Sequence, residues 1–261
     1  MAWKLYLNNR IYGLTPTVTD GAENASYPLV NVSDEDVQTV GKPNTTATTV
    51  WRYDLTAAAA VVGFGIARHT LGIQTASITV KYSSTDTSTD LWAELTTYTA
   101  LTSGAIGNKD AVISVDSVSK RYWWVGITGQ DAVVQIGEIG LFGLVRTLTR
   151  SPRLGLVRGK RKNISRSYTK GGYMRATKWG PQKKVWDVQF TQLTRTTDYA
   201  YIFTELDETY TEGYRPFWFT DEYYSADNYN PAYMVYVEGD ELESSLAECD
   251  RYNLGFRLVE C

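Results

Sequence analysis

The sequence predicts a mostly β protein, with a β-sandwich in its first half and a smaller β-rich domain with one helix in its second half. Tyr and Trp are frequent, with 19 and 8 copies among 261 residues, and aromatic residues favour strands. Short segments of alternating apolar and polar residues recur, and turn-forming stretches separate them. Because a single hydrophobic core approaches its limit at this length, two domains are expected.

Residues 1–145 contain the strands of the predicted sandwich. The expected strands cover residues 78–82, 111–115, 122–127 and 136–142. The segments between them, such as 83–90 and 102–110, are rich in Ser, Thr, Gly, Asn and Asp, which form turns. Several short strands at this spacing are typical of a β-sandwich.

Residues 185–261 are expected to form the second domain. A strand at 185–191 comes first. A helix from Thr197 to Tyr210 follows, because its apolar residues recur at the spacing of one helix face. Strands at 233–237 and 253–258 close the domain, so that a single helix packs against a small sheet.

Charge is unevenly distributed, although the net charge is only −3. Residues 146–184 hold 13 basic residues and no acidic residue, whereas residues 185–261 hold 4 basic and 16 acidic residues. Such segregation favours assembly, in which the basic arm of one subunit meets an acidic region of itself or of a neighbour. Residues 146–184 are therefore predicted to be a basic linker and arm, with an assembly interface formed by Arg150, Arg153, Arg158, Lys160, Arg161, Lys162, Arg166 and Lys170.

A basic stretch can also bind nucleic acid, because Lys and Arg neutralise phosphates. Tyr168, Tyr173 and Trp179 lie among the basic residues and could stack on bases. The acidic half would repel phosphate, however, and the sequence pI of about 5.4 differs from that of a dedicated nucleic-acid binder. Nucleic acid is thus the less favoured partner, and a solvated loop remains an alternative for part of the stretch.

The sequence lacks the residues that most catalytic sites need. His69 is the only histidine, and Cys249 and Cys261 are the only cysteines, which argues against a Cys/His zinc site. No Ser or Cys nucleophile motif accompanies His69, so a structural histidine is expected. We predict neither enzymatic activity nor a cofactor. The longest apolar run, residues 55–67, is shorter than the roughly 20 residues that cross a bilayer, and no membrane insertion is expected.

Two groups of residues are candidate binding sites. Asp34, Glu35 and Asp36 offer oxygen ligands for calcium, but the spacing of an EF-hand is absent, so a solvated acidic loop is the favoured interpretation. Most tryptophans of the first half are expected in the core. Trp92 follows a polar loop and is expected to be exposed. The candidate contacts to a glycan or a protein partner are Trp92, Tyr223, Tyr224 and Tyr229.

Three parts of the first half together resemble the discoidin-like, galactose-binding-type β-sandwich, a jelly-roll domain. Residues 27–32, Tyr-Pro-Leu-Val-Asn-Val, and the following Thr-Val-Trp-Arg at 49–52 resemble the early part of such domains. Residues 61–72 resemble the next pair of elements, and residues 120–124 with 136–139 resemble the late strands. The resemblance covers about residues 20–143 and brings no catalytic motif. It leaves room for calcium, because some discoidin-like domains carry one.

The second half resembles the β-rich tail-tip and baseplate proteins of tailed bacteriophages, including distal tail proteins. The resemblance rests on the order of the basic arm, the strand at 186–190, the entry to the helix at 193–198 and the Gly-Tyr-Arg-Pro-Phe-Trp-Phe segment at 213–219. In such proteins this domain builds rings around the tail, and an attached sandwich domain often projects outward.

These resemblances and the charge segregation predict a structural virion protein of a tailed bacteriophage, made in the cytoplasm of the host bacterium. It would belong to the tail tip or baseplate, or connect the tail to its fibres. A ring-like homo-oligomer, a trimer or a hexamer, is expected, in contact with other tail proteins. The alternative function is a carbohydrate-binding module that recognises host-surface glycans through the first sandwich. Nucleic-acid binding ranks third, and an enzymatic function last.

Overall fold

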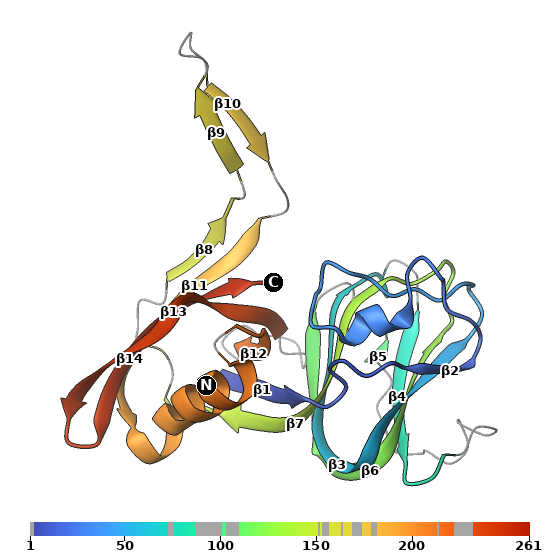
Figure 1. Cartoon of the computed structure of the whole chain (residues 1–261), viewed down its shortest axis with the longest axis horizontal. Helices are drawn as coiled ribbons and strands as arrows, with labels where there is room; N and C mark the ends of the chain where they lie inside the picture. The colour runs from blue at the N-terminus through green and yellow to red at the C-terminus, as the bar shows by residue number, and fades with distance from the viewer. Residues whose placement is uncertain are drawn as a thin grey trace. The chain divides into compact units, whose positions relative to one another are not determined.

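The chain forms two compact units in its computed structural model (Figure 1). The structure describes residues 3–72, 76–86, 101–102, 110–150, 152, 157–162, 164–168, 174–178, 182–212, 214–221 and 232–261. Unit 1 comprises Met1–Thr147 and Trp218–Tyr233, and unit 2 comprises Leu148–Phe217 and Met234–Cys261. The sequence predicts three consecutive segments instead, 1–145, 146–184 and 185–261. It does not anticipate that a piece of the second half returns to unit 1.

Unit 1 is an antiparallel β structure. Its strands follow the order β5-β4-β6-β3-β7-β1-β12, and β2 pairs with β3. The returning strand β12 lies beside β1, with Leu5 opposite Phe219. A short 3-10 helix, η1 (Leu29–Ser33), lies in the loop between β2 and β3. The strands are β1 (Trp3–Asn9), β2 (Thr17–Asp20), β3 (Thr49–His69), β4 (Ser77–Ser83), β5 (Leu101–Thr102), β6 (Ala111–Thr128), β7 (Ile136–Thr147) and β12 (Phe217–Asp221).

Two long strands, β3 and β6, run through the sheet and bend, so that the sheet has two facing parts. They pair with each other over almost their whole length, with shifts in register between Asp54 and Ala59 and between Val61 and Gly63. The first part of β3 pairs also with β2, and its last part pairs with β7. The separate strands predicted at 111–115 and 122–127 are therefore wrong, since β6 runs through both. The residues between them contain no Gly, Pro or Asn to form a turn.

The core of unit 1 lies between the two parts of the bent sheet. Aromatic side chains fill its centre, and Trp51, Tyr53, Phe64 and Trp123 are almost fully buried. Aromatic residues of this size contribute much of the apolar area that a domain removes from water. The predicted fold class, mostly β with one helix in the second half, is confirmed.

Unit 2 contains a sheet of four strands and a separate two-stranded hairpin. The order in the sheet is β13-β14-β11-β8, and β9 pairs with β10. The predicted basic arm thus contains strands, and β8 joins the sheet by pairing with the start of β11. The strands are β8 (Val157–Arg161), β9 (Ile164–Tyr168), β10 (Met174–Lys178), β11 (Lys183–Thr194), β13 (Ala232–Glu248) and β14 (Arg251–Glu260).

The helix predicted at Thr197–Tyr210 is present and somewhat longer. It consists of η2 (Arg195–Tyr199) and η3 (Tyr201–Thr211), both with π-type hydrogen bonding, joined at Ala200. Ile202 and Leu206 are buried, as the apolar spacing predicts. The chain leaves the helix at Glu212, which adopts a left-handed conformation with φ of 49°. None of the helices in the described residues has the length and apolarity needed to cross a membrane.

A buried carboxylate holds the start of unit 2 against this helix. Asp198 is fully buried and accepts three hydrogen bonds: from the backbone N–H of Thr149 at 2.9 Å, from its hydroxyl at 2.7 Å, and from the backbone N–H of Arg150 at 3.0 Å. Hydrogen bonds to a charged acceptor are stronger than neutral ones. Asp198 therefore fixes the segment that enters unit 2.

Candidate functional site

The candidate site of unit 1 lies on the outward face of three neighbouring strands. Residues two apart on a strand share a face, and the alternate residues of the same strands are in the core. We call the outward group, together with Asp86, Lys120 and Arg121 at its margin, the outer patch. Its strand positions are Arg52 and Asp54 of β3, Tyr122 and Trp124 of β6, and Lys81 and Ser83 of β4.

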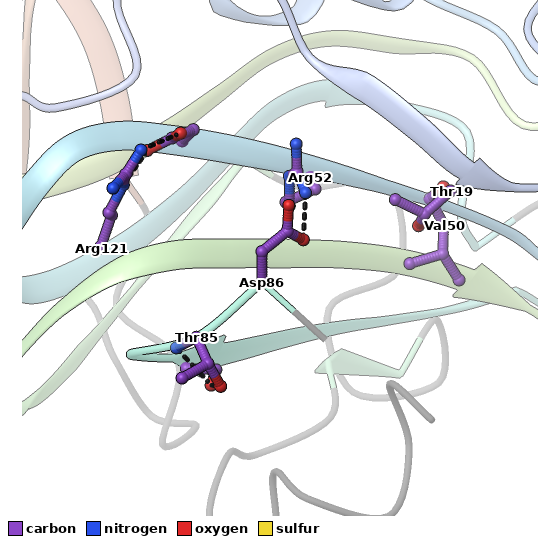
Figure 2. A network of polar contacts seen from close by, with 8 residues as sticks. Thr19, Val50, Arg52, Thr85, Asp86 and Arg121 are labelled. Atoms are coloured by element: carbon purple, nitrogen blue, oxygen red, sulfur yellow. Dashed lines mark hydrogen bonds and ion pairs between the residues drawn. The ribbon is translucent and has the colours of Figure 1, made fainter. Parts of the chain in front are cut away.

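Two ion pairs cross the outer patch (Figure 2). Arg121 donates from Nε and Nη2 to the two carboxylate oxygens of Asp54, at 2.7 and 2.8 Å. Arg52 pairs with Asp86, which follows β4. The hydrogen bond from Arg121 is the main reason why the pKa of Asp54 is lowered. The guanidinium groups of Arg52 and Arg121 lie 5.4 and 4.8 Å from the ring centre of Tyr122.

Two buried nitrogen donors belong to the same patch. Trp124 is 1% exposed and packs with Val50 and Tyr122 on the outward side of the sheet. Its Nε1 and the Nε of Arg52 are buried without a hydrogen-bond acceptor in the described part of the chain. Buried donors are normally paired, and an unpaired one costs about 1–3 kcal/mol. Burial also lowers the pKa of the neighbouring Lys81. An acceptor from a ligand or from water would satisfy the donors.

The charge of the outer patch suits a polar ligand rich in acceptors. It holds four basic side chains and two carboxylates, the basic ones being Arg52, Lys81, Lys120 and Arg121. The excess of two positive charges favours a ligand that carries a negative group. Arginine binds carboxylate, sulfate or phosphate oxygens with two parallel donors. Tyr122 adds an aromatic ring beside these donors.

Sequence reasoning missed the outer patch. Arg52 and Asp54 alternate with the buried Trp51 and Tyr53, and such alternation is also the pattern of a strand whose polar face is solvated. Trp124 was expected in the sandwich core, but it is buried on the opposite face of β6, against Val50. Two consecutive tryptophans must point to opposite faces of one strand. That rule could have indicated a second apolar cluster.

A second polar feature of unit 1 is the buried carboxyl group of Glu138 on β7. Its side chain has no exposed surface. One oxygen, Oε2, accepts a hydrogen bond from the backbone N–H of Glu35 at 3.1 Å, and Oε1 has no partner in the described part of the chain. Burial, followed by the nearby charges of Asp34 and Glu35, raises the pKa of Glu138 well above its usual value. The pKa of Tyr53 is also raised, chiefly by burial, and the charge of Glu138 contributes.

The predicted calcium candidates lie in the loop that covers Glu138. Asp34 accepts hydrogen bonds from the backbone N–H of Asp36 at 2.9 Å and from the hydroxyl of Thr39 at 2.8 Å, and Glu35 has a positive φ of 62°. These bonds give Asp34 local partners without a cation. No three His, Cys, Asp or Glu side chains gather at metal-binding distance in the described ranges. Calcium would therefore need hydroxyl and backbone oxygens of this loop as well as carboxylates, and it stays a prediction.

The other predicted site residues fall into two groups. Lys160, Arg161, Lys162 and Arg166 are described and exposed, and so is Arg150, whose backbone is held by Asp198. Arg161 is already engaged in an ion pair with Glu238. For Arg158 only the backbone of β8 is described. The remaining candidates lie outside the described residues: Trp92, Arg153, Lys170, Tyr223, Tyr224 and Tyr229.

His69 has a structural environment. It is 4% exposed, and its Nδ1 accepts a hydrogen bond from the backbone N–H of Leu71 at 3.3 Å. This nitrogen is therefore engaged in the turn that follows β3. Cys249 and Cys261 are both free thiols.

Comparisons with known proteins find similarity in structure only. No family model matches the sequence, and no curated protein matches it. Similar solved structures include a chitosan-binding module of a Paenibacillus chitosanase/glucanase, with 14% identity over 53% of this chain and 100% of that one and a TM-score of 0.41. The lectin domain of lectinolysin, solved with Lewis B antigen, has 12% identity, covers 52% and 97%, and has a TM-score of 0.42. The module of AlyQ bound to an unsaturated mannuronic acid has 20% identity, covers 51% and 98%, and has a TM-score of 0.40.

Proposed function

We propose that this chain is a non-catalytic binding protein whose unit 1 recognises a glycan through the outer patch. The observation that carries the proposal is a pair of buried donors, Arg52 Nε and Trp124 Nε1, for which the described residues supply no acceptor. They lie on adjacent strands beside the ring of Tyr122. Sugars and their acidic substituents are rich in the acceptors that such donors lack. The positive excess of the patch makes a glycan with a carboxylate or sulfate group the preferred ligand.

The surrounding ion pairs support this proposal. Arg121 and Asp86 are partly exposed, with 41% and 43% of their side-chain surface accessible, whereas Arg52 is 17% accessible. The patch thus has an accessible rim and a buried centre. A ligand that displaced Asp86 from Arg52 would exchange one acceptor for another without leaving the guanidinium unpaired.

The proposal is tested by measuring how the full chain binds a panel of acidic and neutral oligosaccharides. We expect acidic members to bind, and Arg52→Lys or Trp124→Phe to weaken binding about 10-fold or more, as loss of a hydrogen bond to a charged group does. Arg195→Lys, an exposed arginine on η2 in unit 2, is the matched control. Silence across the panel would overturn the proposal, and so would unchanged binding by both outer-patch variants in folded protein.

A second candidate function is that of a structural protein in the tail tip or baseplate of a tailed bacteriophage, or of an adaptor to its fibres. The observation that favours it is the exposed basic hairpin of unit 2, which suits contacts in an assembly. Mass spectrometry of purified phage particles and labelling of these particles by an antibody to the chain test this role. We expect to detect the chain in the particles and to find the label at the end of the tail. Its absence from particles would exclude the role.

A further inference from the structure

The β9–β10 hairpin is a two-stranded ribbon that the described chain leaves uncovered. Every residue of β10 is exposed, including Met174 at 56%. In the register, Arg166 lies opposite Ala176, and Arg175 lies opposite Ser167. Since residues two apart share a face, Arg166, Met174 and Lys178 lie on one side of the ribbon, and Arg175 lies on the other side.

The two sides of this hairpin differ in character. The side with Arg166 also contains Met174, Ala176 and Lys178. The opposite side has Ser and Thr besides Arg175. Alternation of this kind is typical of a strand with one buried face. Because an isolated two-stranded hairpin is only marginally stable in water, the mixed apolar and basic side is suited to contact a partner.

A complementary acidic surface lies on the helix of the same unit. From Tyr201 to Glu212 the sequence has four acidic residues and no basic one, the acidic residues being Glu205, Asp207, Glu208 and Glu212. Glu208 and Glu212 are exposed, and Tyr214 just beyond them is 72% exposed. Burial and the charge of Glu208 raise the pKa of Asp207. The helix therefore offers negative charge next to an exposed aromatic ring, the counterpart of a basic surface with an exposed methionine.

Within one copy, the two surfaces lie beyond opposite ends of β11. The hairpin precedes the first residue of β11, Lys183, and the helix begins directly after its last residue, Thr194. Twelve residues of extended strand span about 40 Å. The helix formed by η2 and η3 begins at that far end and spans about 25 Å, less than the length of β11. We therefore expect contact between hairpin and helix to form between different copies.

We propose that the Arg166–Met174–Lys178 side of the β9–β10 hairpin of one copy binds the acidic helix η3 of a second copy. The two surfaces are different, so the contact is heterologous and each copy can engage two neighbours. Contacts of this type form closed rings or open chains. This interaction goes beyond the proposed glycan function, since it involves unit 2 alone.

Light scattering on the purified full chain, over a range of concentrations and at low and high salt, tests the proposal. We expect multiples of the 29.3 kDa subunit at low salt and smaller species at high salt, where the charges are screened. Arg166→Glu and Arg175→Glu form a matched pair, with the same charge change on opposite sides of one hairpin. Arg166→Glu is expected to give monomers, and Arg175→Glu to keep most of the assembly.

A complementation experiment makes the test specific to the two surfaces. The double variants Arg166→Glu/Lys178→Glu and Glu208→Arg/Glu212→Arg are each expected to be monomeric. In the first, the hairpin side and the helix are both acidic, and in the second, the hairpin side and helix positions 208 and 212 are basic. In an equimolar mixture, each contact between the two different variants therefore joins opposite charges. The mixture is expected to regain the mass of the unmodified chain. Circular dichroism of each variant checks that it is folded.

Two results would overturn the proposal. One is an unmodified chain that stays monomeric at low salt up to the highest concentration reached. The other is a mixture of the folded double variants that fails to assemble. Glycan binding, measured on the same variants, reports separately on unit 1 and is expected to be unaffected by these substitutions.

Discussion

Unit 1 and the β9–β10 hairpin make opposite use of the same strand-forming residues. In unit 1, β3 and β6 bend so that Trp51, Tyr53 and Trp123 face one continuous core and are fully buried. In the hairpin, the alternation of apolar and polar residues is similar, yet Met174 is more than half exposed. Strand pairing alone therefore does not bury a face. A second layer is needed, and the described residues supply none for the hairpin.

This difference indicates that unit 1 contributes most to the stability of the fold, whereas the hairpin is available for contacts with a partner. Removing a large side chain from unit 1 leaves a cavity between two layers, whereas removing one from the hairpin changes only exposed surface. The same contrast holds for charge, because carboxylates are buried in both units, but the basic residues of the hairpin are all exposed where they are described. Four predictions test this contrast.

The largest effect is expected for the core of unit 1. Trp123→Ala removes a fully buried ring and should lower the free energy of unfolding by about 3–5 kcal/mol. Met174→Ala in the hairpin is the matched comparison and should change it by less than about 0.5 kcal/mol. Chemical denaturation followed by circular dichroism measures both. Similar values for the two variants would mean that the hairpin is packed against the rest of the chain.

The next effect concerns the entry to unit 2. Asp198→Ala removes the acceptor of three hydrogen bonds from Thr149 and Arg150 and should destabilise unit 2 by about 1–3 kcal/mol. Thr149→Val removes only the hydroxyl donor and should cost less. Hydrogen exchange of unit 2 amides shows whether the loss is local. Equal protection in Asp198→Ala and the unmodified chain would contradict the anchoring role.

A third prediction has the opposite sign. Glu138→Gln should stabilise unit 1 at neutral pH by an amount on the order of 1 kcal/mol, because folding no longer has to protonate this carboxyl group or bury it as an ion. Since the pKa of Glu138 is raised in the folded protein, its contribution to stability is present at acidic pH and lost as the pH rises through that pKa. The difference between variant and unmodified chain should vanish in acid.

Calcium offers a control for this third prediction. If the loop around Asp34 and Asp36 binds calcium with the help of Glu138, the ion should raise the melting temperature of the unmodified chain. The rise should be absent from Glu138→Gln. A variant that is less stable than the unmodified chain, in calcium-free buffer at neutral pH, would contradict the stated cost of the buried carboxyl group.

The smallest effect is expected for the ion pair of the outer patch. Asp54→Asn removes the partner of Arg121, and such exposed pairs contribute little and are screened by salt. Because the pKa of Asp54 is lowered, its contribution is present at neutral pH and lost as the pH falls below the ordinary value of an aspartate. Melting curves at several pH values, at low salt, should therefore converge for variant and unmodified chain in acid.

Much of the local structure could be predicted from the sequence. The strands at 78–82 and 136–142 and the helix at Thr197–Tyr210 are present, because alternation and helical spacing depend on neighbouring residues. The continuity of β6 was missed, since its central residues are mostly polar and interrupt the apolar pattern of the two predicted strands. The outer patch and the environment of Glu138 were missed for a different reason. Their residues are far apart in the chain and meet only across strands.

The sequence by itself determined the fold class, the position of the helix and the opposite charges of residues 146–184 and 185–261. These features depend on composition and on the spacing of residues within one segment. Only the tertiary structure decided that the segment around β12 returns to unit 1, that Trp124 lies on the outward face with Arg52, and that the basic hairpin and the acidic helix lie beyond opposite ends of β11. The physical reason is that strand order and register depend on long-range pairing, in which a shift of one residue moves every side chain to the other face.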